Sequence, residues 1–224
     1  MTVLLVIAFF ATFVLVDYLL TRRQAAKEAA ARSLRVEPPV EPVWVAGYRL
    51  PEALHYHPGH VWVRPLDRDT VRVGLDDFAR RLIGAASGLR LPALGDWLHQ
   101  GGAGFGVKAD GRAAELLAPI EGEVVAVNPA LRRNPALVTD DPYGRGWVLE
   151  VKAANLAANL RNLLSGRLAR RFMEDSREAL DLRLMALSGS VLQDGGEPVA
   201  DFARHLPAED WKRLASEFLL AAGR

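Results

Sequence analysis

The chain has 224 residues, of which 50% are hydrophobic and 25% are charged, a balance that can support a folded core. Its 28 basic and 27 acidic side chains leave a net charge of +1, so no overall field attracts a nucleic acid backbone and no nucleic acid partner is expected. There is no cysteine, which excludes disulfides, thiolate zinc sites and cysteine nucleophiles.

The first twenty residues form one apolar stretch in which Asp17 is the only charge. As a helix this stretch would be about 30 Å long, which matches the hydrocarbon core of a bilayer. A cleaved signal peptide is disfavoured because no basic residue precedes the stretch and no small-x-small cleavage site follows it. A buried helix of a soluble domain would rarely be apolar on every face. Residues 1–20 are therefore predicted to be a transmembrane helix.

Basic residues follow this stretch directly, at positions 22, 23 and 27. By the positive-inside rule they predict a single-pass protein of the cell membrane whose soluble part lies in the cytoplasm. Residues 21–43 are predicted to be a stalk and a linker. The strong helix formers at 24–33 can continue the helix, and the proline-rich segment 37–42 ends it as an extended spacer.

From residue 44 onward the sequence changes to short β-rich runs separated by glycine, proline and aspartate. One short helix is expected over residues 76–83, because Asp76 or Asp77 can cap it and Phe78, Leu82 and Ile83 share a face. Strands are expected over the following ranges: 61–64, 71–74, 89–92, 104–107, 116–118, 122–127 and 147–151. Many short strands at close spacing predict a small β-sandwich or flattened barrel over residues 44–152.

Two motifs within this region have a functional and a structural interpretation. His55, His57 and His60 could contribute to a metal site, but Pro58–Gly59 interrupts the run and no carboxylate is adjacent, so a structural role is favoured and no metal is assigned. Gly101–Gly106 is rich in glycine, but it precedes a strand and not a helix. A turn is therefore favoured over a phosphate-binding loop.

No catalytic constellation is found. The adjacent acids Asp76–Asp77 and Asp140–Asp141 lie at predicted turns or caps, and no nucleophile is paired with a base, so the chain is not expected to be an enzyme. A basic run beyond the β-rich region could contact anionic lipid, but acidic residues follow it and a solvated helix face is favoured. The run consists of Arg161, Arg167, Arg170 and Arg171.

The series of local motifs resembles the glycine cleavage system H protein family. The resemblance covers residues 54–152, in order and with almost no gaps. It rests on the following segments: Tyr56–Val63, Val73–Gly84, Leu91–Asp96, Ala118–Asn128, Asn134–Val138 and Asp141–Trp147. It implies a flattened β-barrel or sandwich of the biotinyl/lipoyl-carrier type. The family presents a lysine at the tip of a hairpin, and its lipoyl arm carries an aminomethyl group between separate enzymes, while the carrier itself catalyses little.

The chain departs from the family where this lysine is expected. In the family, the lysine lies eight residues before a proline that matches Pro119. Counting back eight residues from Pro119 gives Gly111. Counting forward from Phe105 gives Arg112 instead. Neither residue is a lysine, and an arginine does not form the lipoyl amide. Lys108 is the one substitute nearby, and it is expected about 10 Å back from the tip along the strand.

Residues 153–224 are predicted to form a C-terminal helical extension. Helical spacing runs through the middle of it, at Leu168, Phe172, Ala179, Leu180, Leu184 and Leu187. A turn is expected near residues 194–198. Pro207 suits the start of a last helix, in which Trp211, Leu214, Phe218 and Leu219 form an apolar stripe. The stripe could pack on its own domain, which is favoured, or on a partner protein.

The favoured hypothesis is a membrane-tethered, H-protein-like module that is not lipoylated and serves as a non-catalytic interaction or regulatory platform. Residues 1–20 would contact the membrane, and the protein partner would be a glycine-cleavage-like or lipoate-handling protein. The alternative is a working lipoyl carrier of a glycine-cleavage-like system, with its lipoyl cofactor attached to Lys108.

Overall fold

The computed structural model describes residues 2–33, 42–188 and 202–220. The chain divides into two units, Met1–Glu37 and Pro38–Arg224. The predicted linker at 37–42 and the predicted turn at 194–198 fall almost wholly outside the described residues. Only Pro42, the last residue of that linker, is described, and it begins the first strand of the second unit.

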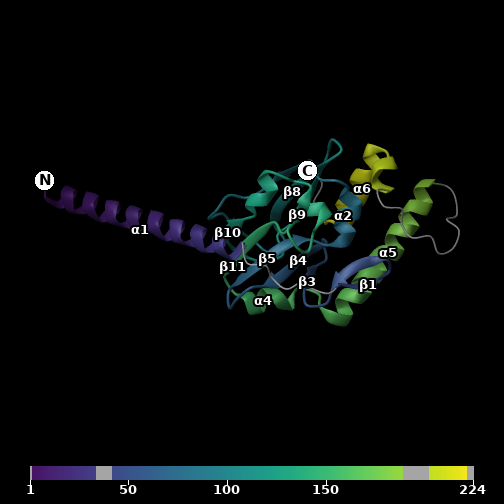
Figure 1. Ribbon diagram of the computed structural model, residues 1–224, viewed down its shortest axis with the longest axis horizontal. Coiled ribbons are helices and arrows are strands. Elements are labelled where there is room, and N and C mark those ends of the chain that lie inside the picture. The colour runs from purple at the N-terminus through teal and green to yellow at the C-terminus, as the bar shows by residue number, and fades with distance from the viewer. Residues whose placement is uncertain (1, 34–41, 189–201, 221–224) are drawn as a thin grey trace. The chain divides into compact units, whose positions relative to one another are not determined.

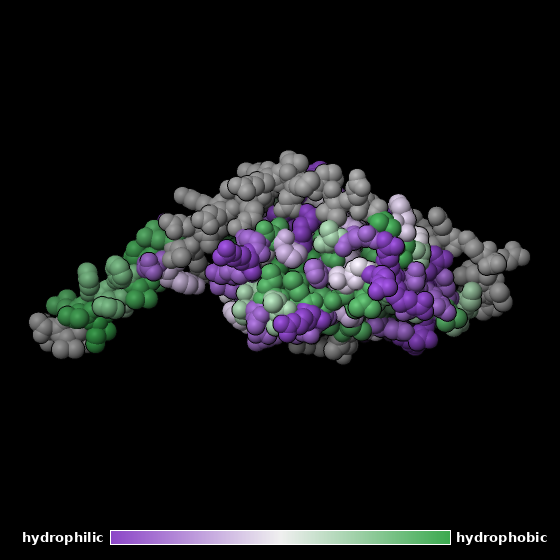
Figure 2. Space-filling model, turned by 90° about the horizontal axis from the view of Figure 1, so that it is seen from below, coloured by the Kyte–Doolittle hydropathy of each residue, from purple (hydrophilic) through white to green (hydrophobic). Residues whose placement is uncertain are grey.

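The first unit consists of helix α1 (Thr2–Ser33), which includes the predicted helical stalk. Its described apolar side chains are exposed, for example Phe9 at 74% and Phe10 at 67%. Figure 2 shows this apolar surface in green along the helix at the left. The prediction of a transmembrane helix over residues 1–20 is not supported, because no helix in the described ranges combines the length and the apolarity needed to cross a membrane.

The second unit is mainly β (Figure 1). Its strands are β1 (Pro42–Val45), β2 (Tyr48–Pro51), β3 (His55–His57), β4 (Val61–Pro65), β5 (Thr70–Leu75), β6 (Gly88–Arg90), β7 (Trp97–Leu98), β8 (Ala103–Ala109), β9 (Arg112–Leu117), β10 (Gly122–Val127) and β11 (Leu149–Ala153). All seven predicted strands overlap an observed strand, and the largest difference is in β9, which begins at Arg112 and not at residue 116. The hairpin of β1 and β2 was not predicted; it turns at Ala46 and Gly47, which both have positive φ.

The strands form a six-stranded antiparallel sheet in the order β3–β4–β5–β11–β10–β7, a three-stranded sheet in the order β6–β8–β9, and the separate pair β1–β2. The last strand in sequence, β11, therefore lies between β5 and β10 in the larger sheet. This arrangement confirms the predicted sandwich of the lipoyl-carrier type. Buried residues of both sheets fill its core, including Trp62, Phe105, Leu116 and Val124.

A close approach between β4 and β5 depends on a glycine. Trp62 is paired with Gly74 across the two strands, and a Cβ atom at residue 74 would lie 2.5 Å from the indole ring. The ring is fully buried, and its Nε1 donates a hydrogen bond to the carbonyl oxygen of Pro142 at 3.1 Å. Gly74 thus makes room for a fully buried tryptophan of the core.

Helices connect and cover the sheets: α2 (Asp77–Ile83), α3 (Leu137–Asp140), α4 (Leu156–Arg161), α5 (Gly166–Ser188), α6 (Ala208–Phe218) and the 3₁₀ turns η1 (Pro129–Arg132) and η2 (Phe202–His205). The helix α2 matches its prediction. The carboxylate of Asp76 accepts the N–H of Ala79 at 2.8 Å, and Gly84 ends the helix with a φ of +83°.

The buried face of α5 agrees with the predicted one only in part. Leu180 of the predicted set is buried, together with Ala169 and Met173, whereas Leu168 is 66% exposed and Leu187 is 40% exposed. Both positional sets have helical spacing, so periodicity alone did not decide which stripe faces the domain. The apolar stripe of α6 packs on its own domain, with Trp211, Leu214, Phe218 and Leu219 all buried.

Candidate functional site

The hairpin of β8 and β9 carries the positions at which a lipoyl arm was considered. Ala109 pairs with Arg112 across the hairpin, which leaves Asp110 and Gly111 as a two-residue turn. Both have positive φ, 48° and 73°, as the tight hairpin turn of this length requires. The structure therefore places a tight Asp-Gly turn at the tip of this hairpin.

Gly111 lies at the open end of this tip. It is exposed, and an added Cβ atom would meet no other atom within 4 Å. Arg112, the other position that corresponds to the family lysine, is only partly exposed. Its Nη2 donates a hydrogen bond to the carbonyl oxygen of Leu206 at 2.7 Å, and its guanidinium carbon lies 5.4 Å from the centre of the Trp211 ring.

Asp110 makes a second contact with the C-terminal part of the chain. Its carboxylate forms an ion pair with Nε of Arg204 at 3.0 Å. The hydrogen bond from Arg204 lowers the pKa of this carboxyl, and the charge of Arg112 acts in the same direction. The carboxylate therefore stays ionised at pH values below those at which an ordinary aspartate takes up a proton. Both partners remain in contact with water, so the pair adds little stability.

Lys108 lies one pair of residues back from the tip, opposite Ala113 on β9 and Gly88 on β6. Its side chain is exposed. A Cβ atom at Gly88 would lie 3.8 Å from both Cβ and Cδ of Lys108, so the lysine stem extends over β6. The backbone carbonyl of Lys108 accepts hydrogen bonds from the N–H and the hydroxyl of Ser87, at 2.7 and 3.2 Å. The lysine is accessible, but its stem extends across the sheet.

We define the covering segment as residues 204–219, which reach the tip from the far end of the chain. Besides contacting Asp110 and Arg112, this segment is fixed to the helix α2. Trp211 is 3% exposed, and its Nε1 donates a hydrogen bond to the carbonyl oxygen of Leu82 at 2.8 Å. Figure 1 shows α6 beside α2 and near the β8–β9 hairpin. The apolar stripe of α6 is evident in the sequence, but its place beside the hairpin is not, because no local motif links residues 94 positions apart.

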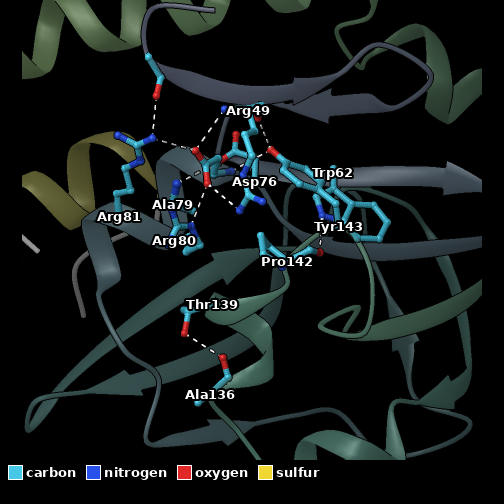
Figure 3. A network of polar contacts seen from close by, with 12 residues as sticks. Arg49, Trp62, Asp76, Ala79, Arg80, Arg81, Ala136, Thr139, Pro142 and Tyr143 are labelled. Carbon is cyan, nitrogen blue, oxygen red and sulfur yellow. Dashed lines mark hydrogen bonds and ion pairs between the residues drawn. The ribbon is translucent and has the colours of Figure 1, made fainter. Parts of the chain in front are cut away.

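The helix α2 is in turn held by a polar network around its first turn (Figure 3). The fully buried carboxylate of Asp77 is in contact with the side chains of Arg49, Arg80 and Arg81, at 3.4, 2.8 and 3.3 Å. The hydroxyl of Tyr143 accepts the N–H of Asp77 at 2.8 Å and donates to the carbonyl oxygen of Arg49 at 2.7 Å. This network fixes the helix whose last turn receives Trp211.

The two adjacent acids at the start of α2 have separate roles. Besides capping the helix, Asp76 lies 2.7 Å from Nδ1 of His60 through its other oxygen. The imidazole of His60 stacks on Phe78 at 4.0 Å and is 1% exposed. The two carboxylates therefore point to different partners, and Asp76 lies at the predicted helix cap.

Two of the three histidines, His57 and His60, form contacts within the domain. Nδ1 of His57 accepts the N–H of Gly59 at 3.0 Å. Burial lowers the pKa of His57, and the neighbouring His60 lowers it further. In the part of the chain that the structure describes, no group of three or more histidine, aspartate or glutamate side chains is arranged to hold a metal ion.

The glycine-rich segment and the basic run also have structural roles. Gly104 and Gly106 lie within β8, so this segment enters the hairpin as expected. In the basic run, Arg170 forms an ion pair with Glu52, and Arg171 forms ion pairs with Glu174 and Asp175. These contacts are exposed, as on a solvated helix face.

Comparison with known proteins gives a consistent assignment. The family model described as glycine cleavage H-protein matches residues 54–176. The glycine cleavage system H protein of Mycobacterium avium is 42% identical over 109 residues, which are 49% of this chain and 83% of that protein. The H protein of Bacteroides fragilis is 40% identical over 114 residues, 51% of this chain and 89% of that protein.

Among solved structures, a glycine cleavage system H protein from Mycobacterium marinum matches with 27% sequence identity and a TM-score of 0.49, covering 56% of this chain and 98% of that chain. The family match extends past the predicted boundary at residue 152, through α4 and into α5. Residues 177–224, which include the covering segment, lie outside the match.

Proposed function

Because the chain belongs to the glycine cleavage H-protein family, we propose that it is an H-protein-like module without a lipoyl arm, which serves as a non-catalytic platform for protein partners. The observation that carries this proposal is the composition of the hairpin tip. Asp110, Gly111 and Arg112 occupy it, and none of them has an amine that could form the lipoyl amide.

The state of Arg112 supports the same proposal. An arginine guanidinium stays protonated and is a poor nucleophile, and here it is held by the carbonyl oxygen of Leu206 and the ring of Trp211. Arg112 therefore has a binding role within the chain. The resemblance to H proteins makes glycine-cleavage-like or lipoate-handling proteins the proposed class of partner.

The alternative function, a working carrier modified at Lys108, is favoured by one observation. Lys108 is an exposed lysine on the same hairpin. Against it, the lysine stem extends over β6 at Gly88 and not toward the tip, so a modifying enzyme would have to accept a lysine displaced along the strand.

Mass spectrometry of the protein from its native cells separates the two functions. The peptide that contains Lys108 is expected to be unmodified when the cells are supplied with lipoate, and glycine-cleavage-like or lipoate-handling proteins are expected to co-purify with the unmodified chain. An increase in the mass of this peptide that corresponds to a lipoyl amide on Lys108 would reject the platform function and support the carrier function. Peptides from a lipoylated protein of the same cells serve as the positive control.

Attachment to a membrane is part of the proposal, and the exposed apolar side chains of α1 support it. Leu5, Phe9 and Phe13 are exposed by 64–74%, and apolar side chains gathered on one element favour a membrane surface or a protein partner. The predicted position of the β-rich unit in the cytoplasm stays a prediction.

Cell fractionation tests this attachment. The full chain is expected with the membranes, and a variant lacking residues 2–20 is expected in the soluble fraction, because the exposed apolar side chains are lost. Recovery of the full chain in the soluble fraction would contradict the attachment.

A further inference from the structure

The hairpin tip has an occupant within the same chain. The covering segment contacts the tip at Asp110 through Arg204 and at Arg112 through Leu206 and Trp211. These three contacts involve the two residues that flank Gly111, while Gly111 itself stays exposed. The covering segment therefore lies over the Arg112 side of the tip, at one of the two positions that correspond to the family lysine.

The covering segment is held by more than surface charges. An exposed ion pair such as Asp110–Arg204 stabilises a contact only weakly. Trp211, however, is almost fully buried and hydrogen-bonded to Leu82, and the ring of Phe218 lies 5.1 Å from that of Phe78. Buried aromatic side chains contribute strongly at such contacts, so the covering segment is fixed against α2 and extends from there to the tip.

We propose that the covering segment closes the Arg112 side of the hairpin tip to acyl transfer. The tip and the adjoining end of α2 then form an interaction surface whose occupant is the C-terminal end of the same chain. This inference rests on the proposed function and deepens it. The tip of this protein differs from that of a carrier in its residue at position 112 and also in the cover over that residue.

The reaction that the cover opposes is the acylation of a lysine amine at position 112. In acylation, the unprotonated Nζ of a lysine attacks the acyl carbon of an activated lipoyl ester, the ester bond to the leaving group breaks, and the nitrogen loses one proton to the buffer. The covering segment opposes this reaction in two ways. The carbonyl oxygen of Leu206 and the Trp211 ring favour the charged ammonium form, which is not nucleophilic, and the covering segment limits the approach of the ester.

The test uses Arg112→Lys in the full chain, with the N-hydroxysuccinimide ester of lipoic acid as the probe. The rate of acylation at each lysine is followed by peptide mass spectrometry. Lys108 serves as the exposed reference on the same hairpin, and Lys152, whose side chain is 58% exposed on β11, serves as a reference in the larger sheet. The introduced lysine is expected to react about tenfold more slowly than Lys108, because a charged hydrogen bond and a cation–π contact both hold its ammonium form.

Adding Trp211→Ala to this variant is expected to raise the rate at position 112 to that of Lys108. The matched control is Trp97→Ala, which removes a tryptophan that is 51% exposed on β7, and it is expected to leave the rate unchanged. Equal acylation rates at positions 108 and 112 in Arg112→Lys would overturn the inference. So would an unchanged rate at position 112 when Trp211→Ala is added.

Loss of a buried tryptophan can also unfold the domain, and the rate at Lys152 would then rise together with the rate at position 112. In that case the pH dependence of acylation in the single variant Arg112→Lys decides, since a lysine whose ammonium form is held by the cover loses its proton at a higher pH than an exposed lysine. A rate at position 112 that rises at a higher pH than the rate at Lys108 supports the cover, and the same pH dependence at both positions rejects it. A lipoyl group found on Lys108 of the native protein would instead reject the proposed function and leave this measurement valid.

Discussion

Replacement of Arg72 by methionine is expected to lower the free energy of unfolding by about 3–5 kcal/mol, because it leaves a buried carboxylate without its charged partner. Arg72 on β5 is paired with Glu150 on β11. Its Nη2 and Nε donate to the same carboxylate oxygen at 2.7 and 3.2 Å, and the side chains are 6% and 0% exposed. The guanidinium also lies over the ring of Trp147 at 4.6 Å.

Urea unfolding of the parent, of Arg72→Met and of a double variant measures this effect. The double variant Arg72→Met, Glu150→Leu removes both charges, and it is expected to recover much of the lost stability because apolar residues can replace a buried ion pair at little cost. A loss below about 1 kcal/mol in the single variant, as for an exposed pair, would show that the ion pair does not hold β5 and β11 together.

Asp77→Asn is expected to cost about 3 kcal/mol, because the neutral amide leaves three arginine side chains around a buried site with no negative charge. Burial raises the pKa of Asp77, but the charge of Arg80, the N–H of Arg49 and the charge of Arg81 outweigh it, so the net shift is downward. The unfolded chain therefore takes up the proton first as the pH falls. The contribution of Asp77 to stability is present above the ordinary aspartate pKa of 3.8 and is lost as the pH falls through the lower, folded value.

Thermal unfolding at pH 7 and at pH 3 tests both parts of this prediction. Asp77→Asn is expected to be less stable than the parent at pH 7 and to lose less stability on acidification. Asp175→Asn is the matched control, because Asp175 is 53% exposed in its contact with Arg171; its effect is expected to stay within about 0.5 kcal/mol. An acid response of Asp77→Asn equal to that of the parent would contradict the assigned role.

Local structure was predictable where the chain carries strong local signals. The strands around residues 61–64, 71–74 and 122–127 and the helix at 76–83 all follow from alternation, turn residues and the cap at Asp76. The short hairpin of β1 and β2 was missed. Its turn residues, Ala46 and Gly47, include a non-glycine residue with positive φ, and alanine gives no sign of that conformation.

The candidate site was predictable only in part. The Asp110–Gly111 turn and the absence of lysine at positions 111 and 112 can be read directly from the sequence. The contacts of Arg112 with Leu206 and Trp211 cannot, because they join segments 94 or more positions apart and depend on how α5 and α6 return to the domain. Periodicity identified the buried stripe of α6, but a stripe does not specify the surface that it covers.

The central position of β11 has a consequence for synthesis and folding. Because β11 lies between β5 and β10, the larger sheet cannot close until the residues up to about Ala153 have left the ribosome. Until then β5 and β10 each have an unpaired edge, and the ion pair between residues 72 and 150 joins positions 78 apart. Such distant pairing slows folding and leaves strand edges open to wrong partners. For this chain, the order of synthesis therefore makes the middle of the sheet the last part to form, and the C-terminal helices can cover the hairpin only afterwards.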